Sequence, residues 1–292
     1  MNIACLCPVI VGRSTELLAN SIACFERQTY PAELRRLVVW DDVGQLQPQS
    51  GEGWSIETSD QRQPSLPAKY DGMINRFNLD VWADAYAVWD VDDVYLPHHL
   101  QAAAIALTAK PALQDARLGW VHPHLFYSSH PAGPGSQLGS HQKLVTWTPT
   151  GVLASESAAG RMHGSLVVGQ RALERVGGWL GVMPRGRDWR FQPGYLPGDC
   201  RADFDQRMIA ALEAAGANLP RSRPAALNPT YVYRWATIEH LHCSGFMRSP
   251  EDETWYQTYL KRMGELPKFG EVTPGLDAET ADLIERWEHG EI

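Results

Sequence analysis

Three aspartates stand within four positions, directly after a short run of strand-forming residues. The run is Ala85–Trp89, and the acids are Asp90, Asp92 and Asp93. Neighbouring carboxylates raise each other's pKa unless a cation compensates their charge. Carboxylate oxygens are preferred ligands of Mg²⁺ and Mn²⁺, which fill their other positions with phosphate oxygens and water. The pattern predicts either a metal–diphosphate site at a strand end or a solvated turn in which Asp93 caps the next helix.

The elements that must position these acids form an alternating pattern of strands and helices. Asn2–Cys7 predicts a buried first strand, Ser14 caps a helix with apolar residues at helical spacing, and Leu37–Trp40 predicts a second strand. A strand, a helix and a strand in succession make a βαβ unit, whose two strands are parallel. We therefore expect a parallel sheet, to which Ala85–Trp89 adds a third strand.

Ligands of parallel α/β sheets bind beyond the carboxyl ends of the strands. Each of the three predicted strands ends in residues suited to such a site. The Pro8–Val9 segment follows the first strand, Asp41 and Asp42 follow the second, and the three clustered aspartates follow the third. The sequence thus predicts one ligand-binding edge built from all three strand ends.

The rest of the chain gives weaker patterns. Gln45–Pro67 predicts a loop with room for one edge strand. The other predicted helices are Ala68–Leu79, Pro97–Ala109, Arg171–Val176, Asp203–Ala215, Pro250–Met263 and Leu276–His289, and the other predicted strands are Gly119–His122, Leu144–Trp147, Ser165–Val168 and Tyr231–Trp235.

Composition narrows the class of protein. The chain has 292 residues and a formal net charge of −8, which disfavours a general polyanion binder and a nucleic-acid partner. No apolar run approaches the roughly 18–20 residues that span a bilayer, and no secretory signal is visible. The five cysteines are odd in number and scattered, so we expect reduced, mostly buried thiols in a cytoplasmic protein.

Several segments, in order along the chain, resemble those of family 2-like glycosyltransferases of the GT-A fold, in the nucleotide-diphospho-sugar transferase superfamily. The matching segments read C-P-V-I-V-G-R, S-I-A-C-F-E-R-Q-T-Y-P, L-V-V-W-D-D-V-G, L-P-A-K-Y-D-G-M-I-N, V-W-D-V-D-D-V-Y-L-P and H-G-S-L-V-V-G-Q-R-A-L-E-R-V-G-G-W. Each fragment is weak alone, and the specificity of the resemblance comes from their order over most of the chain.

The resemblance implies a fold and a reaction. The fold is α/β, with a mixed, mostly parallel central sheet flanked by helices and a C-terminal acceptor-side subdomain. Residues 1–110 would form the nucleotide-sugar-binding half, residues 111–249 the acceptor-binding and catalytic half, and residues 250–292 terminal helices. The reaction would be inverting, metal-dependent transfer from a nucleotide-diphosphate sugar, with a UDP-sugar favoured, to an unknown hydroxyl acceptor. The metal would be Mn²⁺ or Mg²⁺.

The resemblance also assigns the donor site by position. The Pro8–Val9 segment would line the nucleotide base, and Asp41 or Asp42 would accept a hydrogen bond from the N–H group of that base. Arg13 and Lys69 could neutralise phosphates, although each alone reads as a surface charge. The competing interpretation of the two strand ends is that they are capped turns without a ligand.

Two ways of placing the metal ligands remain open. Asp90 and Asp92 fit the D-x-D spacing, and the pair Asp92–Asp93 fits the commoner family version, in which the last aspartate binds the ion. We favour Asp92 for the sugar or ribose and the metal, and Asp93 as a direct ligand, with Asp90 beside the donor. His242, preferred to His240 in the late segment, would complete the metal shell.

Inverting transfer needs a carboxylate that deprotonates the acceptor hydroxyl. The family places this base at the start of a helix after the Gly-Gly-aromatic turn. Asp203 fits this role best and Asp199 second, whereas Asp205 is expected to face solvent. The alternative is that these acids only complement the helix dipole. His163, Trp179 and Trp189 are candidates for contact with the acceptor.

Two other functions compete with sugar transfer. A sugar-phosphate nucleotidyltransferase shares strand-end acids, but it needs a Gly-rich basic loop after the first strand, which the segment from Pro8 to Arg13 lacks. A non-catalytic nucleotide-sugar-binding module would explain the donor residues but not a retained base candidate.

Overall fold

The computed structural model describes residues 1–9, 15–91, 93–108, 115–121, 127–128, 145–148, 151–154, 166–182, 203–215 and 230–233. The predicted terminal helices Pro250–Met263 and Leu276–His289 lie outside these ranges, as do Cys200 and Cys243. Cys5, Cys7 and Cys24 are buried and form no disulfide, as predicted.

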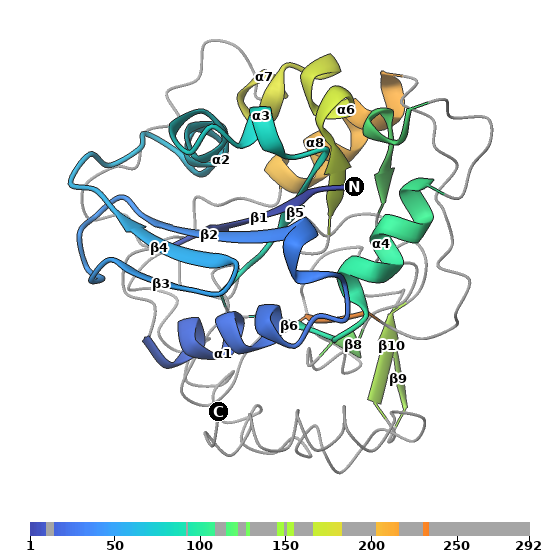
Figure 1. The fold of residues 1–292 in the computed structure, drawn as a ribbon. Coiled ribbons are helices and arrows are strands. Elements are labelled where there is room, and N and C mark those ends of the chain that lie inside the picture. The colour runs from blue at the N-terminus through green and yellow to red at the C-terminus, as the bar shows by residue number, and fades with distance from the viewer. Residues whose placement is uncertain are drawn as a thin grey trace, which may run out of the picture.

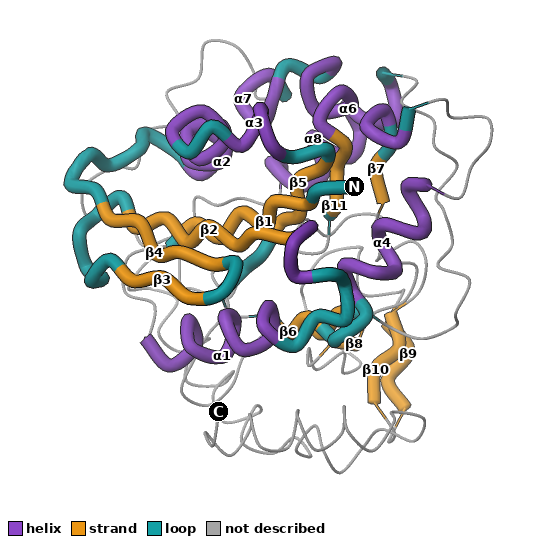
Figure 2. The backbone as a smooth tube through the Cα atoms, viewed as in Figure 1, coloured by secondary structure: helices purple, strands orange, loops and turns teal. Residues whose placement is uncertain are grey.

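The described strands form a central seven-stranded sheet in the order β3-β4-β2-β1-β5-β11-β7. Its four middle strands are parallel, whereas β3 and β11 are antiparallel to their neighbours. This confirms the predicted mixed, mostly parallel α/β sheet, which runs through the middle of the molecule (Figures 1 and 2). The strands are β1 Ile3–Pro8, β2 Arg35–Asp41, β3 Gln49–Gly51, β4 Trp54–Thr58, β5 Ala85–Val88, β7 Trp120–Val121 and β11 Val167–Gly169.

Helices cover both faces of this sheet (Figure 1). One face carries α1 and α4, and the other carries α2, α3, α6, α7 and α8. Side chains of β1 alternate between the two layers, with Cys5 and Cys7 in one cluster and Ala4 and Leu6 in the other. Burial on both faces explains the continuous apolar run of β1. The helices are α1 Thr15–Glu26, α2 Leu66–Arg76, α3 Leu79–Trp82, α4 His99–Thr108, α6 Gln170–Arg175, α7 Gly178–Gly181 and α8 Asp203–Ala214, with short 3-10 turns at Ala32–Leu34 and Ala116–Leu118.

A second sheet has the order β6-β12-β8-β10-β9. It brings Val94–Tyr95, directly after the clustered aspartates, against the late segment Tyr231–Tyr233. The acid segment therefore leads from the central sheet into the second one. The strands are β6 Val94–Tyr95, β8 Tyr127–Ser128, β9 Val145–Thr148, β10 Gly151–Ala154 and β12 Tyr231–Tyr233.

The structure corrects three of the predicted elements. The loop Gln45–Pro67 contains two strands, β3 and β4, rather than one. The helix expected over Ala68–Leu79 is divided into α2 and α3 by Asn78, whose φ of 51° is left-handed. The helix expected from Pro97 begins at His99, because β6 and a turn come first.

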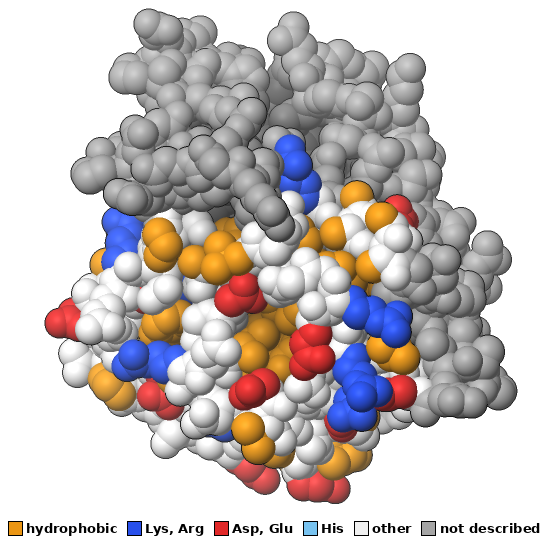
Figure 3. Space-filling model, turned by 90° about the horizontal axis from the view of Figure 1, so that it is seen from above, with side chains coloured by type: hydrophobic (Ala, Val, Ile, Leu, Met, Phe, Trp, Pro, Cys, Tyr) orange, Lys and Arg blue, Asp and Glu red, His pale blue; other side chains and the backbone are white. Residues whose placement is uncertain are grey.

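The described residues show how charge is distributed on one face and how apolar the helices are. In the described part of the face seen from above, acidic and basic side chains lie interspersed (Figure 3). None of the described helices has both the length and the apolar character needed to cross a bilayer.

Candidate functional site

The order of the strands places a topological switch point between β1 and β5. The chain passes from β1 to β2 on one side and onward to β4, and then crosses to β5 on the other side of β1. Helix α1, after β1, and helix α2, before β5, cover opposite faces of the sheet. Open α/β sheets bind ligands in the crevice at such a point, beyond the carboxyl ends of the strands. The structure brings the predicted acids after β2 and β5 to this edge, on either side of the Pro8–Val9 segment.

The carboxylate of Asp41 is occupied by its own loop. Its Oδ1 accepts the backbone N–H groups of Val43 at 2.9 Å and Gly44 at 3.2 Å, and its Oδ2 accepts that of Leu46 at 2.6 Å. Gly44 has a φ of 79°, which glycine adopts without steric cost. Asp41 is fully buried, and its carboxylate anchors the loop after β2.

Asp42 forms a buried ion pair with Lys69 of α2. The Lys69 Nζ lies 2.6 Å from Asp42 Oδ1 and also donates to the carbonyl oxygen of Val9 at 2.5 Å. Asp42 Oδ2 accepts the N–H group of Gln63 at 2.7 Å. Burial lowers the pKa of Lys69, and the carboxylate of Asp42 opposes this effect. Lys69 therefore joins α2 to the ends of β1 and β2, a position that differs from the expected contact with phosphates.

The acids after β5 are held by side chains from other elements. The N–H group of Asp90 donates to the hydroxyl of Tyr95 at 2.7 Å, and the Asp90 side chain is partly exposed. Asp93 is buried, and its Oδ2 accepts the hydroxyl of Tyr231 at 2.5 Å. Because α4 begins only at His99, the alternative in which Asp93 is a solvated helix cap is wrong.

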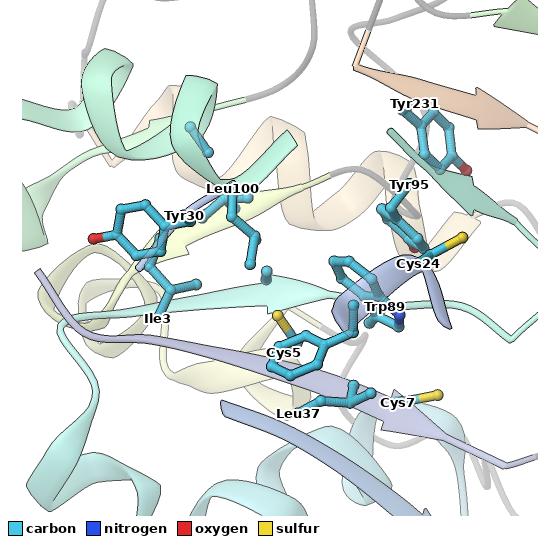
Figure 4. Packing of buried hydrophobic residues seen from close by; sticks show 14 of the residues in the cluster. Ile3, Cys5, Cys7, Cys24, Tyr30, Leu37, Trp89, Tyr95, Leu100 and Tyr231 are labelled. Carbon is cyan, nitrogen blue, oxygen red and sulfur yellow. The ribbon is translucent and has the colours of Figure 1, made fainter. Parts of the chain in front are cut away.

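Aromatic rings pack together beside Asp90 and Asp93, the residues of the acid turn, and Figure 4 shows three of these rings, Trp89, Tyr95 and Tyr231. Trp89 and Tyr95 stack with ring centroids 3.8 Å apart, and Tyr231 lies 5.4 Å from Tyr95. His99 packs against Tyr95, and its Nδ1 lies 3.1 Å from Thr230 Oγ1. Burial raises the pKa values of Tyr95 and Tyr231, with the nearby carboxylates adding to the effect. Both hydroxyls therefore stay protonated at neutral pH.

Gln28 is a positioning residue that the sequence analysis did not single out. Its side-chain amide donates to the carbonyl oxygen of Leu96 at 2.8 Å, and its Oε1 accepts the N–H group of Leu100 at 3.0 Å. The N–H group of the next residue, Thr29, donates to the carbonyl oxygen of Pro97 at 2.7 Å. The turn after α1 thus fixes the segment that leaves the acid turn. The only signal in the sequence was a glutamine directly after the predicted helix.

The Gly-Gly-Trp turn is organised by Asp71 of α2. Its two carboxylate oxygens accept the N–H groups of Trp179 at 3.0 Å and Leu180 at 2.9 Å. Gly178 has a φ of 78°, and a Cβ there would lie 2.8 Å from an oxygen of Asp71, which explains the glycine. The Trp179 ring is fully buried and stacks on Tyr70 at 5.1 Å. This position in the core does not favour the expected acceptor contact by Trp179.

Of the remaining predicted site residues, Asp203 lies within the described ranges. Asp203 is the first residue of α8, whose Met208 and Leu212 are buried in the core. Outside the described ranges lie Arg13, Asp92, His163, Trp189, Asp199 and His242. Within those ranges no group of three metal-ligating side chains occurs. Asp90 and Asp93 offer carboxylate oxygens only, a donor set that suits Mg²⁺ or Mn²⁺ bound together with phosphate oxygens.

No protein-family model matches the chain, and no curated protein sequence matches it. Among solved structures, it matches S. aureus TarS 1–349 in complex with UDP-GlcNAc at 11% identity and a TM-score of 0.46, over 100% of this chain and 72% of that one. It also matches the mannosyltransferase PcManGT from Pyrobaculum calidifontis, in complex with GDP-Man and Mn²⁺, at 12% identity and a TM-score of 0.38, over 99% of this chain and 86% of that one.

Proposed function

We propose that the protein is a metal-dependent, inverting glycosyltransferase that moves a sugar from a nucleotide-diphosphate sugar to a hydroxyl acceptor. The observation that carries this proposal is the switch point between β1 and β5, with the buried Asp42–Lys69 pair on one side and the acid turn on the other. The order of the sequence motifs supports sugar transfer over other reactions of nucleotide-binding α/β proteins. A UDP-sugar is the favoured donor.

The donor base would lie against the Pro8–Val9 segment and Asp42. Lys69 fixes both the carbonyl oxygen of Val9 and the carboxylate of Asp42, so these two acceptors are oriented before a ligand arrives. Asp41 supports them through the loop after β2. In this arrangement Lys69 acts by positioning, and Arg13 remains the candidate for contact with the phosphates.

The acid turn would hold the divalent ion. Asp93 and Asp92 are the proposed ligands, with Asp90 close to the donor and His242 completing the set. When bound, Mn²⁺ or Mg²⁺ would neutralise charge that develops on the leaving diphosphate. The tyrosine hydroxyls around the turn would keep the carboxylates oriented.

Asp203 is the proposed base, with Asp199 as the alternative. Its carboxylate would take the proton of the acceptor hydroxyl while the acceptor oxygen forms a bond to the anomeric carbon of the sugar. The bond from that carbon to the β-phosphate oxygen breaks on the opposite side, so the configuration inverts and the nucleoside diphosphate leaves. His163 and Trp189 are the proposed acceptor contacts.

Loss of Asp93 should remove this activity. The assay follows release of the nucleoside phosphate from a panel of UDP-, GDP-, dTDP- and CMP-sugars with Mn²⁺ present. We expect Asp93→Ala and chelation by EDTA each to lower the rate by about 10²-fold or more, because charge on the leaving group is no longer compensated. Asp80→Ala, an exposed acid of α3, is the matched control and should behave as the unchanged protein.

The same panel separates the competing functions. Activity that survives both chelation and Asp93→Ala would contradict the metal role. Thermal stabilisation by nucleoside triphosphates alone would favour a nucleotidyltransferase. Stabilisation by a nucleotide sugar with no turnover across a wide set of hydroxyl acceptors would favour a non-catalytic binding module.

A further inference from the structure

We propose that Tyr231 is a positioning residue for the divalent ion, because its hydroxyl holds the carboxylate of Asp93 in the orientation in which it meets the ion. The inference rests on the proposed function, in that it takes the acid turn as the metal site. It goes beyond that function by giving a role to β12, a short strand late in the chain.

The contact between the two side chains is direct and buried. The Tyr231 hydroxyl donates to Asp93 Oδ2 at 2.5 Å, and the two residues are 138 positions apart in the sequence. Tyr231 is fully buried, and Asp93 is only 3% exposed. A hydrogen bond to one carboxylate oxygen in such a place fixes the rotation of the carboxylate, which determines where its other oxygen points.

The backbone explains how so distant a residue reaches the acid turn. Strand β12 pairs antiparallel with β6, and Tyr231 lies opposite Tyr95 while Val232 lies opposite Val94. Asp93 immediately precedes β6, so this pairing carries its side chain alongside β12. The pairing of these two short strands therefore places the Tyr231 hydroxyl next to the carboxylate of Asp93.

Tyr95 fixes the other end of the same turn. Its hydroxyl accepts the backbone N–H group of Asp90, and its ring lies between Trp89 and Tyr231 (Figure 4). The backbone of Asp90 and the side chain of Asp93 are thus held by two neighbouring tyrosines. This arrangement orders the acids before the ion binds, and partners that orient metal ligands are typically worth about 10–100-fold in metal affinity.

The test removes one oxygen atom. Tyr231→Phe keeps the ring and its packing against Tyr95 but deletes the donor to Asp93. Mn²⁺ binding is titrated by electron paramagnetic resonance, with UDP or GDP present. We expect the Kd for Mn²⁺ to rise about 10–100-fold. In the transfer assay the Mn²⁺ concentration for half-maximal rate should rise in parallel, while the rate at saturating Mn²⁺ changes less.

The matched control is Tyr30→Phe. Tyr30 is also buried, and its hydroxyl donates to the carbonyl oxygen of Met1, near the start of β1 and so at the other end of the central sheet. Both variants lose one hydrogen bond, so both should lose a similar amount of thermal stability. Only Tyr231→Phe should weaken Mn²⁺ binding. Unchanged Mn²⁺ affinity in Tyr231→Phe, or an equal loss in Tyr30→Phe, would overturn the inference.

A second measurement on the unsubstituted protein keeps the inference testable if Tyr231→Phe does not fold. Because Asp93 links the ion to Tyr231, Mn²⁺ with UDP should slow hydrogen exchange of the backbone amides of residues 231–233; unchanged exchange at saturating Mn²⁺ would overturn the inference. A protein that binds Mn²⁺ through Asp93 but transfers no sugar would refute the proposed function and leave the role of Tyr231 standing. A protein that binds no Mn²⁺ would refute both.

Discussion

Strands β2 and β5 end at the same edge of the sheet, and each is followed by clustered aspartates, yet the two sets of acids are held differently. After β2, Asp41 and Asp42 accept hydrogen bonds from their own loop, from Gln63 and from Lys69. After β5, the backbone of Asp90 and the side chain of Asp93 are fixed by tyrosine hydroxyls of the second sheet. The acids after β2 organise the backbone, whereas those after β5 are oriented as a unit by other elements.

The difference shows that a strand-end aspartate does not by itself mark a ligand. The charge of Asp42 is balanced within the protein by the Lys69 ammonium. At the acid turn, the hydroxyls of Tyr70 and Tyr231 donate to the carboxylates of Asp90 and Asp93 and orient them without neutralising their charge. Carboxylate oxygens oriented in this way suit a divalent cation such as Mn²⁺ or Mg²⁺. This contrast is why we place the metal after β5 and a structural ion pair after β2.

Removing the Lys69 ammonium should have the largest effect on stability. Lys69→Met keeps most of the side-chain volume but leaves the buried carboxylate of Asp42 without a cation and the Val9 carbonyl oxygen without a donor. We expect the free energy of unfolding to fall by about 3–5 kcal/mol, measured by urea denaturation.

A double variant tests whether the uncompensated charge is the cause. Lys69→Met combined with Asp42→Asn removes the charge and keeps an acceptor for Gln63, so it should be more stable than Lys69→Met alone. If Lys69→Met instead keeps full stability and only weakens donor binding, Lys69 contacts phosphates as the sequence suggested, and the contrast between the two strand ends fails.

Substitution of Asp41 should lower the stability of the protein by a smaller amount. Asp41→Asn preserves the shape of the side chain but turns one acceptor into an amide NH₂ group, so at least one of the N–H groups of Val43, Gly44 and Leu46 loses its partner. We expect a loss of about 1–3 kcal/mol in the free energy of unfolding. Urea denaturation measures the loss, and an unchanged midpoint would show that the loop does not depend on this carboxylate.

The sequence predicted the three strands of the site well, because each is an apolar run buried on both faces that ends at a proline or at aspartates. The sequence could not tell the role of Asp41 from that of Asp42, because the two adjacent aspartates differ only in the partners that they contact in the folded protein. Those partners are distant: Lys69 lies 27 residues from Asp42, and Tyr231 lies 138 residues from Asp93.

The second sheet was the hardest part to predict. Val94–Tyr95 and Tyr127–Ser128 are strands of two residues each, too short to show the alternation that indicates a strand. They exist because other strands pair with them. Trp179 illustrates the same limit for side chains: as one of eleven tryptophans it gave no sign of whether it binds a ligand or fills the core, and the stacking on Tyr70 decides for the core.

The smallest effect on stability is expected at Asp90, the counterpart of Asp41 at the end of β5. The carboxylate of Asp90 is partly exposed and lies 3.5 Å from the Tyr70 hydroxyl, and the hydrogen bond that fixes this residue uses its backbone N–H group, which Asp90→Asn retains. We expect the free energy of unfolding to change by less than about 0.5 kcal/mol.

Mn²⁺ binding in the presence of UDP should nevertheless weaken, because the variant lacks one negative charge beside the ion. The same substitution thus lowers stability at one strand end and metal affinity at the other. If Asp90→Asn destabilises the protein as much as Asp41→Asn does and binds Mn²⁺ normally, the acids after β5 are structural too, and the metal site must be sought elsewhere.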